Sequence, residues 1–269
     1  MPMSLELLEC HSPRWSADGK HLAFAWKNDA GFGLYLVKAD GTDLRRVTTD
    51  PAPGDARDPA WSPDGKHLAF AIRREGSWDI ALIKLDGGGL TYVTEGPAND
   101  RSPDWSPDGK RLAFARDAER TRDVYVVSAA GGDPVRLTDS PADDVCPRWQ
   151  PSGARIAFAT DREGTRRLYS MQPDGADPTR LADVVAGEPA WSPDGSALAY
   201  AGTTEPRNAR GPLPVGLCIL SLADGSVRKL QGGVRGHAPD WSRDGSQIVF
   251  TRDFGLCVLD LDDNSVTLL

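Results

Sequence analysis

Six near-copies of one short motif divide the sequence into units of similar length. The copy WSPDGKHLAFA spans residues 61–71. The six motif tryptophans are separated by 46, 44, 44, 42 and 50 residues and are Trp15, Trp61, Trp105, Trp149, Trp191 and Trp241. A period near 45 residues with strand-like content is typical of a propeller blade of four strands rather than a helical solenoid. The repeat therefore predicts an all-β fold, a six-bladed β-propeller of four-stranded antiparallel blades.

The motif encodes a tight turn followed by a buried strand. Pro63 presets the backbone angle of the first central turn position, Asp64 suits the second, and Gly65 tolerates a positive φ. The segment Leu68 to Ala71 is apolar at every position instead of alternating. Neither face of this segment is expected to meet water, as for a strand between two neighbouring blades.

Each unit also contains segments that fit a third and a fourth strand. The expected third strands are 34–37, 80–83, 124–127, 168–171, 217–220 and 256–259. Six complete blades then fill residues 1–269 as a single domain, with blades beginning near residues 12, 58, 102, 146, 188 and 238. The closing outer strand is either 5–8 or 266–269, and the short turn at 262–264 favours the C-terminal segment. In that case the ring closes through side-chain packing.

The pattern PxWSPDGKxLAF, followed by an xxYV strand and an RLT strand, resembles the WD40-like repeats, also called PD40 repeats, of the TolB propeller family. The resemblance covers residues 12–269. It implies a six-bladed propeller used mainly for protein interaction. The family's name-giving type also carries an N-terminal α/β domain and a periplasmic signal, and the sequence shows neither. We therefore expect the propeller part alone, without that type's specific role.

Charge and the N-terminal residues limit the classes of partner and the location. The formal net charge of -8 argues against general affinity for nucleic acid or for an anionic membrane. The opening MPMSLELLEC lacks the features of a secretory signal, and no later segment has the length of a membrane-spanning helix. We expect a monomer in the cytoplasm without membrane insertion, or a periplasmic protein if the chain is a processed fragment.

No catalytic signature stands out, and no cofactor is expected. A G-x-S-x-G nucleophile motif is absent, and the glycine-rich turns lack the context of a phosphate-binding loop. His11 and His237 enter neighbouring blades of the ring, but two histidines alone make a weak metal site. The Asp-rich stretches 141–144 and 260–263 leave calcium as an alternative, although neither has EF-hand spacing.

The four cysteines predict no disulfide framework. Cys218 and Cys257 occupy a third-strand position that holds Tyr in other blades, which predicts small buried side chains. Cys10 and Cys146 precede the first strands of opposite blades. This arrangement is consistent with a reducing compartment.

The two faces of the predicted ring differ in how much their loops vary. The SPDG turns and the third-to-fourth turns emerge on one face and are nearly uniform, so we call it the uniform face. The other face, here the variable face, carries the between-blade connections and the second-to-third loops, including a long loop at 202–216. Binding residues concentrate on loops displayed by a rigid scaffold. The candidate contacts on this face are Arg73, Arg74, Asp100, Asp144, Arg207 and Arg210.

The central channel offers a second group of candidates. The residues between the Pro and the Trp of each first strand are Arg14, Ala60, Asp104, Arg148, Ala190 and Asp240. We expect Arg14, Asp104, Arg148, Asp240, His11 and His237 to line or border the channel and to offer mixed charges to a peptide or small ligand.

Two functions remain open at this point. The first is a non-enzymatic interaction module that binds a protein or peptide at the variable face and channel mouth. The alternative is an enzyme or small-ligand sensor of lactonase, lyase or hydrolase type with its site on the propeller axis. That alternative needs a converging cluster drawn from His11, Asp58, Asp100, Asp104, Glu188, His237 and Asp240.

Overall fold

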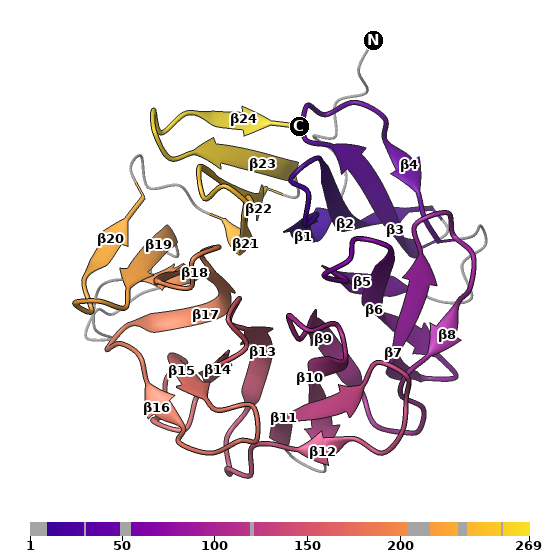
Figure 1. Cartoon of the computed structure of the whole chain (residues 1–269), viewed down its shortest axis with the longest axis horizontal. Coiled ribbons are helices and arrows are strands. Elements are labelled where there is room, and N and C mark those ends of the chain that lie inside the picture. The colour runs from indigo at the N-terminus through magenta and orange to yellow at the C-terminus, as the bar shows by residue number, and fades with distance from the viewer. Residues whose placement is uncertain are drawn as a thin grey trace.

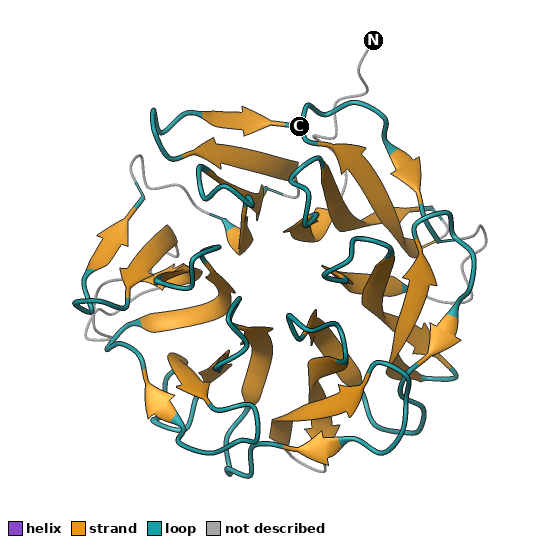
Figure 2. Cartoon of the chain, viewed as in Figure 1, coloured by secondary structure: helices purple, strands orange, loops and turns teal. Residues whose placement is uncertain are grey.

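The computed structural model describes residues 10–29, 31–48, 55–118, 121–203, 216–230, 236–253 and 255–269. These residues form six four-stranded antiparallel sheets arranged around a central axis (Figure 1), which confirms the predicted six-bladed propeller. The described part of the chain is built from strands and loops (Figure 2), and it contains no helix long and apolar enough to cross a membrane.

Each sheet is a meander in which the strands follow one another from the axis outward. The first strands surround the axis and are β1 (Cys10–Trp15), β5 (Ala56–Trp61), β9 (Asp100–Trp105), β13 (Asp144–Trp149), β17 (Val185–Trp191) and β21 (His237–Trp241). The second strands follow the motif turn and are β2 (His21–Asn28), β6 (His67–Arg74), β10 (Arg111–Ala118), β14 (Ile156–Thr160), β18 (Ala197–Thr203) and β22 (Gln247–Arg252).

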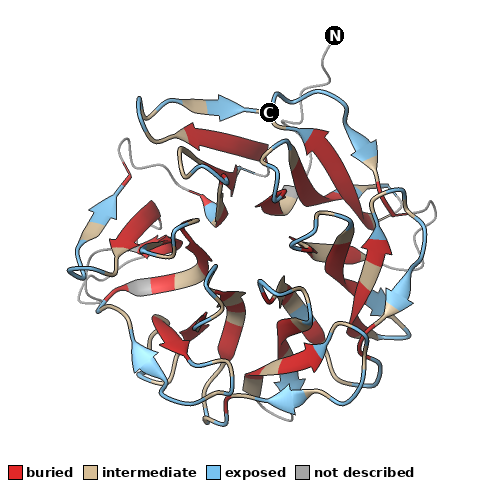
Figure 3. Cartoon of the chain, in the orientation of Figure 1, coloured by how far each residue is buried: buried red, intermediate tan, exposed pale blue. Residues whose placement is uncertain are grey.

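The third strands are largely buried, whereas the fourth strands are short and mostly exposed (Figure 3). The third strands are β3 (Gly31–Lys38), β7 (Ser77–Lys84), β11 (Thr121–Ser128), β15 (Arg167–Met171), β19 (Gly216–Ser221) and β23 (Gly255–Asp260). The fourth strands are β4 (Arg45–Arg46), β8 (Thr91–Tyr92), β12 (Val135–Arg136), β16 (Thr179–Arg180), β20 (Val227–Lys229) and β24 (Val266–Leu268). The observed blades begin one to three residues earlier than predicted, because the first strands extend before their prolines.

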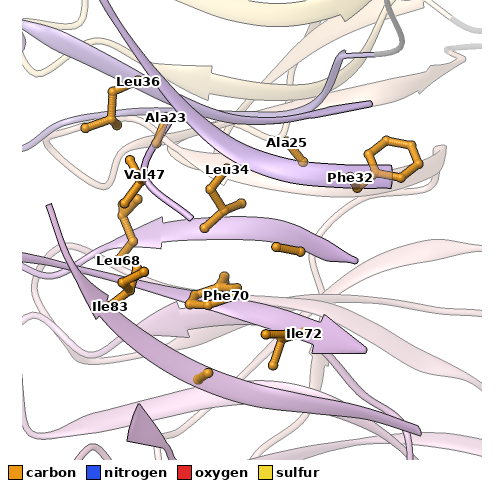
Figure 4. Packing of buried hydrophobic residues seen from close by; sticks show 12 residues of the cluster. Ala23, Ala25, Phe32, Leu34, Leu36, Val47, Leu68, Phe70, Ile72 and Ile83 are labelled. Carbon is orange, nitrogen blue, oxygen red and sulfur yellow. The ribbon is translucent and has the colours of Figure 1, made fainter. Parts of the chain in front are cut away.

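The core lies between neighbouring blades, as the uninterrupted apolar second strands predicted. Phe70 of β6 is fully buried in a cluster with Leu34 and Leu36 of β3 and with Ile83 of β7 (Figure 4). Equivalent phenylalanines or tyrosines are fully buried in every second strand. Each blade therefore packs one face of its inner strands against the preceding blade and the other face against the next blade. This packing holds the first strands in place around the axis.

The motif turns adopt the predicted geometry. Gly65 has a φ of 67°, which an L-residue adopts only with strain. The Ser62 hydroxyl donates to Asp64 Oδ1 (2.6 Å) and accepts from the His67 amide (2.9 Å). Four other turns repeat both bonds, while blade four has Gln150 and Ser152 at these positions. The turns of the uniform face thus satisfy their own polar groups.

The C-terminal segment supplies the outer strand of the last blade, since β24 pairs with β23. The other option, residues 5–8, lies outside the described residues. Side chains of β1 to β3, including Phe24 and Tyr35, pack against Val249 of β22 and Leu256 of β23. The first and last blades therefore meet through side-chain packing, as predicted.

Candidate functional site

Every first strand is interrupted by a β-bulge just before its motif tryptophan. The pairing of β5 with β6 shifts register between Arg57 and Ala60, and the other five blades shift at the same place. In each bulge the residue preceding the proline has a φ of 50–53°, which costs about 1–3 kcal/mol for a non-glycine residue. These six residues, here the bulge ring, are Ser12, Asp58, Ser102, Cys146, Glu188 and Ala238.

Side chains of the bulge ring meet across neighbouring blades. Ser12 Oγ donates to Asp58 Oδ1 (2.9 Å), and the Ser102 amide donates to Asp58 Oδ2 (3.3 Å). The Ala238 amide donates to Glu188 Oε2 (2.7 Å). Asp58 and Glu188 belong to β5 and β17, which lie on opposite sides of the ring (Figure 1).

Cys146 of the bulge ring has an unreactive thiol. Burial, with smaller contributions from Glu188 and Asp58, raises the pKa of its thiol to about 12. Since the thiolate is the reactive form of cysteine, this side chain stays a protonated thiol at neutral pH.

Two residues further along the first strands, four charged side chains form the channel quartet: Arg14, Asp104, Arg148 and Asp240. Arg14 Nη1 lies 3.3 Å from Asp240 Oδ1, and Arg148 Nη1 lies 4.0 Å from Asp104 Oδ1. The quartet lines a cavity of about 180 Å³ together with Ala60, Ala190 and several motif tryptophans, so all six blades contribute. The structure therefore brings these four predicted channel residues together.

Burial sets the protonation of the two quartet carboxyls. It raises the pKa of Asp104 to about 7, against the opposing effects of Arg14 and of the Trp149 amide. It also raises the pKa of Asp240, again against Arg14. The channel at this level thus contains a carboxyl group that titrates near neutral pH.

The quartet also reveals an internal two-fold repeat. Asp240 Oδ2 accepts from the Trp15 amide (2.8 Å) where blade six meets blade one, and Asp104 Oδ2 accepts from the Trp149 amide (2.7 Å) where blade three meets blade four. At the other four junctions the motif indole donates to a first-strand carbonyl of the preceding blade at 3.0–3.2 Å. At two opposite junctions an aspartate carboxylate therefore binds the tryptophan amide, and at the other four the tryptophan indole binds a carbonyl.

At the variable-face end of the first strands, aromatic rings and guanidinium groups alternate. Arg57 Cζ lies 3.8 Å from the ring centroid of Phe32 and 5.5 Å from that of Trp78. Arg101 Cζ lies 4.7 Å from the Trp78 centroid. We call Phe32, Arg57, Trp78 and Arg101 the stacked ladder. It spans blades one to three, and β1, β5 and β9 lie side by side there (Figure 1).

The predicted contact residues on the variable face differ in how exposed they are. Arg73 is exposed at the end of β6. Arg74 is partly buried, lies 3.4 Å from Glu95 and stacks on Tyr92 at 4.2 Å. Arg207 and Arg210 lie outside the described residues.

The two predicted acidic contacts are internal. Asp100 is 1% exposed and receives two 2.7 Å hydrogen bonds from Arg116, while Asp144 is fully buried and receives two 3.1 Å bonds from Arg162. Both carboxylates serve ion pairs inside the protein, because an arginine of the same blade takes up both oxygens of each. Their burial leaves no surface for contact with a partner.

The structure does not bring the predicted histidines together with other metal-binding side chains among the described residues. His11 lies against Phe32, with ring centroids 5.3 Å apart, and His237 is exposed at the start of β21. Within the described ranges, no group of three or more His, Cys, Asp or Glu side chains is arranged to hold a metal ion. In the stretch 141–144, Asp143 pairs with Arg122 and Asp144 with Arg162. Calcium stays an untested prediction.

The cluster expected for an axial enzyme is divided among three places. Asp58 and Glu188 belong to the bulge ring, and Asp104 and Asp240 belong to the channel quartet. Asp100 is taken up by Arg116. The carboxylates are thus distributed along the channel instead of gathering at one point.

The stacked ladder was not predicted from the sequence, nor were the bulge-ring residues Ser12, Ser102 and Ala238. A signal was present in the repeat register, at the position four residues before the motif tryptophan. That position holds His11, Arg57, Arg101, Val145, Gly187 and His237. His11 and His237 were predicted as channel residues, and the same position in the other blades would have identified Arg57 and Arg101.

The fold and the channel define a β-propeller whose side chains converge on an axis, a class that contains both binding modules and enzymes. A family model described as the TolB beta propeller domain matches residues 51–121 and 100–258, and the chain belongs to this family. No curated protein matched the sequence.

Solved structures agree with this fold. TolB from Acinetobacter baumannii is 21% identical over 92% of this chain and 62% of its own, with a TM-score of 0.78. The chain therefore spans less than two thirds of that TolB. A chain from a nidogen/laminin complex is 14% identical over 92% of both chains, with a TM-score of 0.73. An oligogalacturonate lyase in complex with manganese is 16% identical over 98% of this chain and 79% of its own, with a TM-score of 0.68. At these identities the likeness shows the fold alone.

Proposed function

We propose that this protein is a non-enzymatic interaction module that binds a protein or peptide across the variable face and the channel mouth. The observation that carries the proposal is the contrast between the two faces. Turns of the uniform face repeat one set of internal hydrogen bonds. Around the channel mouth, equivalent positions carry chemically different side chains on the same rigid frame. A frame of this kind displays a specific recognition surface.

Two further observations support a protein partner. Arg73 and the two arginines of the stacked ladder place basic groups on the variable face, and arginine is enriched in protein interfaces. One protein of similar fold comes from a nidogen/laminin complex, in which it is associated with another protein. A cytoplasmic location remains part of the proposal, and the free thiols of Cys146, Cys218 and Cys257 support it.

Site-specific photocrosslinking in lysate of the source organism tests the proposal. A crosslinking residue in place of Arg73, on the variable face, should capture a discrete protein. The same residue in place of Arg243, in the exposed motif turn of blade six, is the matched control and should capture nothing comparable. Arg73→Glu should weaken the native complex without changing the thermal midpoint. A chelator added in parallel tests the calcium prediction, because a calcium-dependent complex would lose its crosslink.

Equal crosslinking from both faces, or none from Arg73, would count against the module and favour the alternative of an axial enzyme or small-ligand sensor. That alternative has its own support in Asp104, whose pKa of about 7 suits proton transfer in a channel cavity of about 180 Å³. An oligogalacturonate lyase is among the structures of similar fold.

A further inference from the structure

The stacked ladder contains two guanidinium groups that have no acidic partner in the part of the chain that the structure describes. Among the described residues, neither Arg57 nor Arg101 lies within 4.0 Å of a carboxylate, and Arg57 Nε is buried without a hydrogen-bond partner. This is unusual in a chain with 39 acidic and 31 basic residues, in which most buried or half-buried arginines around the ring are paired.

The acidic residues closest to these arginines in sequence are occupied elsewhere. Asp55 Oδ1 accepts from the Phe32 amide (3.0 Å), and Asp58 accepts from Ser12 and Ser102. Asp100, next to Arg101, is held by Arg116. The two guanidinium groups therefore keep their charge and their outward N–H groups for a ligand.

Contacts with aromatic rings also restrict these groups before any ligand arrives. Arg57 lies between the rings of Phe32 and Trp78, and Trp78 is in turn covered by Arg101. A planar guanidinium held by its face presents its edge as a two-pronged donor, which matches the two oxygens of a carboxylate. Because the rings restrict its rotamers, less conformational entropy is lost on binding.

The rest of the mouth differs from this site. At the position of Arg57 and Arg101, blades four and five carry Val145 and Gly187. Val145 is 4% exposed, and the Arg166 side chain lies over Gly187. Blades two and three are therefore the ones that place an arginine at this position of the mouth.

We propose that the stacked ladder is a carboxylate-recognition site for an acidic segment of a partner protein. Glu or Asp side chains of this segment bind the edges of Arg57 and Arg101. Charge complementarity selects this occupant, since two uncompensated arginines suit a few carboxylates. The net charge of -8 opposes a long polyanion such as nucleic acid. The inference rests on the proposed function and names the chemistry of the partner.

The test uses a fluorescein-labelled decapeptide of alternating Glu and Gly, and its twin with Gln in place of Glu. At low ionic strength, fluorescence anisotropy should show binding of the Glu peptide and none of the Gln peptide. Arg57→Gln/Arg101→Gln should weaken Glu-peptide binding at least tenfold. Arg57→Lys/Arg101→Lys keeps both charges but loses the paired N–H donors of the guanidinium group. Its affinity for the Glu peptide should therefore lie between those of the wild type and the Gln variant.

The matched control is Arg228→Gln/Arg243→Gln, which removes the same charge from two exposed arginines on β20 and on the uniform face. This control should bind the Glu peptide within twofold of the wild type, and all variants should keep the wild-type thermal midpoint. Equal weakening in both Gln variants would show a general charge effect and overturn the proposal. Absence of Glu-peptide binding would also overturn it.

A fluorescein-labelled oligothymidylate of ten nucleotides is the competing ligand. If it binds more tightly than the Glu peptide and depends on Arg57 and Arg101, the site recognises phosphate and the proposal is wrong. The crosslinking experiment at Arg73 uses neither the peptide nor these arginines. A crosslinked partner without Glu-peptide binding would therefore contradict only the carboxylate site, whereas failure of both experiments would reject the interaction module itself.

Discussion

At the scale of single residues, the bulge ring keeps six non-glycine residues at positive φ. Ala238 is the simplest member, because its side chain is a methyl group and its contact with Glu188 uses the backbone amide. Ala238→Gly should therefore relieve strain while keeping that hydrogen bond. We expect the free energy of unfolding to rise by roughly 0.5 kcal/mol, since the relief of about 1–2 kcal/mol is partly offset by the greater freedom of glycine in the unfolded chain.

Ala190→Gly is the control for this substitution, and chemical denaturation provides the measurement. Ala190 is 1% exposed, pairs with Ala199 in the regular part of β17, and does not have a positive φ. Its replacement should lower the free energy of unfolding by about 1 kcal/mol. If both substitutions destabilise equally, the bulge does not store backbone strain.

At the scale of strands and turns, the elements that repeat in every blade could be predicted from the sequence. Features that depend on contacts between neighbouring blades could not. The motif tryptophan, the turn glycine and the apolar second strand recur with one period, so the blades followed directly from the pattern. The bulge was hidden because a residue before proline normally favours an extended conformation, as at Asp58 before Pro59. The stacked ladder was hidden because it joins the start of a third strand to the first strand of the next blade, as Trp78 does with Arg101.

Blade four offers a natural test of the motif turn, because Gln150 and Ser152 replace the usual Ser and Asp. Its Ala154 amide donates to Ser152 Oγ at 3.3 Å, whereas in blade five the Ser196 amide donates to Asp194 Oδ1 at 3.0 Å. Gln150→Ser/Ser152→Asp should restore the usual bonds and raise the free energy of unfolding by about 1 kcal/mol at neutral pH, as measured by denaturant titration.

The pH dependence of this gain separates the turn from general packing. Hydrogen bonds from the Ser62 hydroxyl and the Lys66 amide hold the pKa of Asp64 below its ordinary value, and the new carboxyl in blade four, where Ala154 stands at the position of Lys66, should behave similarly. Because its folded-state pKa lies below the unfolded-state pKa, this carboxyl stabilises the protein at pH values above the unfolded-state pKa. The stabilisation is lost as the pH falls through the folded-state pKa. The gain of the double variant should therefore vanish in acid. A gain independent of pH would contradict the turn mechanism.

At the scale of the whole molecule, the ring closes where the chain provides no connection. Blades six and one are joined by side-chain packing and by Asp240, which accepts from Arg14 and the Trp15 amide. The opposite junction, between blades three and four, uses Asp104 in the same way. There, however, a short stretch of backbone links β12 to β13. The internal two-fold repeat thus supplies two junctions of like chemistry that differ in covalent continuity.

This difference predicts unequal effects of Asp240→Ala and Asp104→Ala. Both aspartates have side chains that are 21% exposed, and each removal costs about 1–3 kcal/mol by leaving a buried donor unpaired. After Asp104→Ala the short backbone link still holds blades three and four together, so they re-form contact at little entropic cost. Among the described residues, no backbone segment links blades six and one directly, so after Asp240→Ala their covalent connection runs through the other four blades. We expect amide hydrogen exchange to accelerate in β1 and β21 of Asp240→Ala, but not in β9 and β13 of Asp104→Ala.

The measurement is made at pH 8, above the Asp104 pKa of about 7, so that the wild-type carboxylate is charged. Similar exchange at both junctions would show that the junction between blades six and one opens no more readily than one with a covalent link.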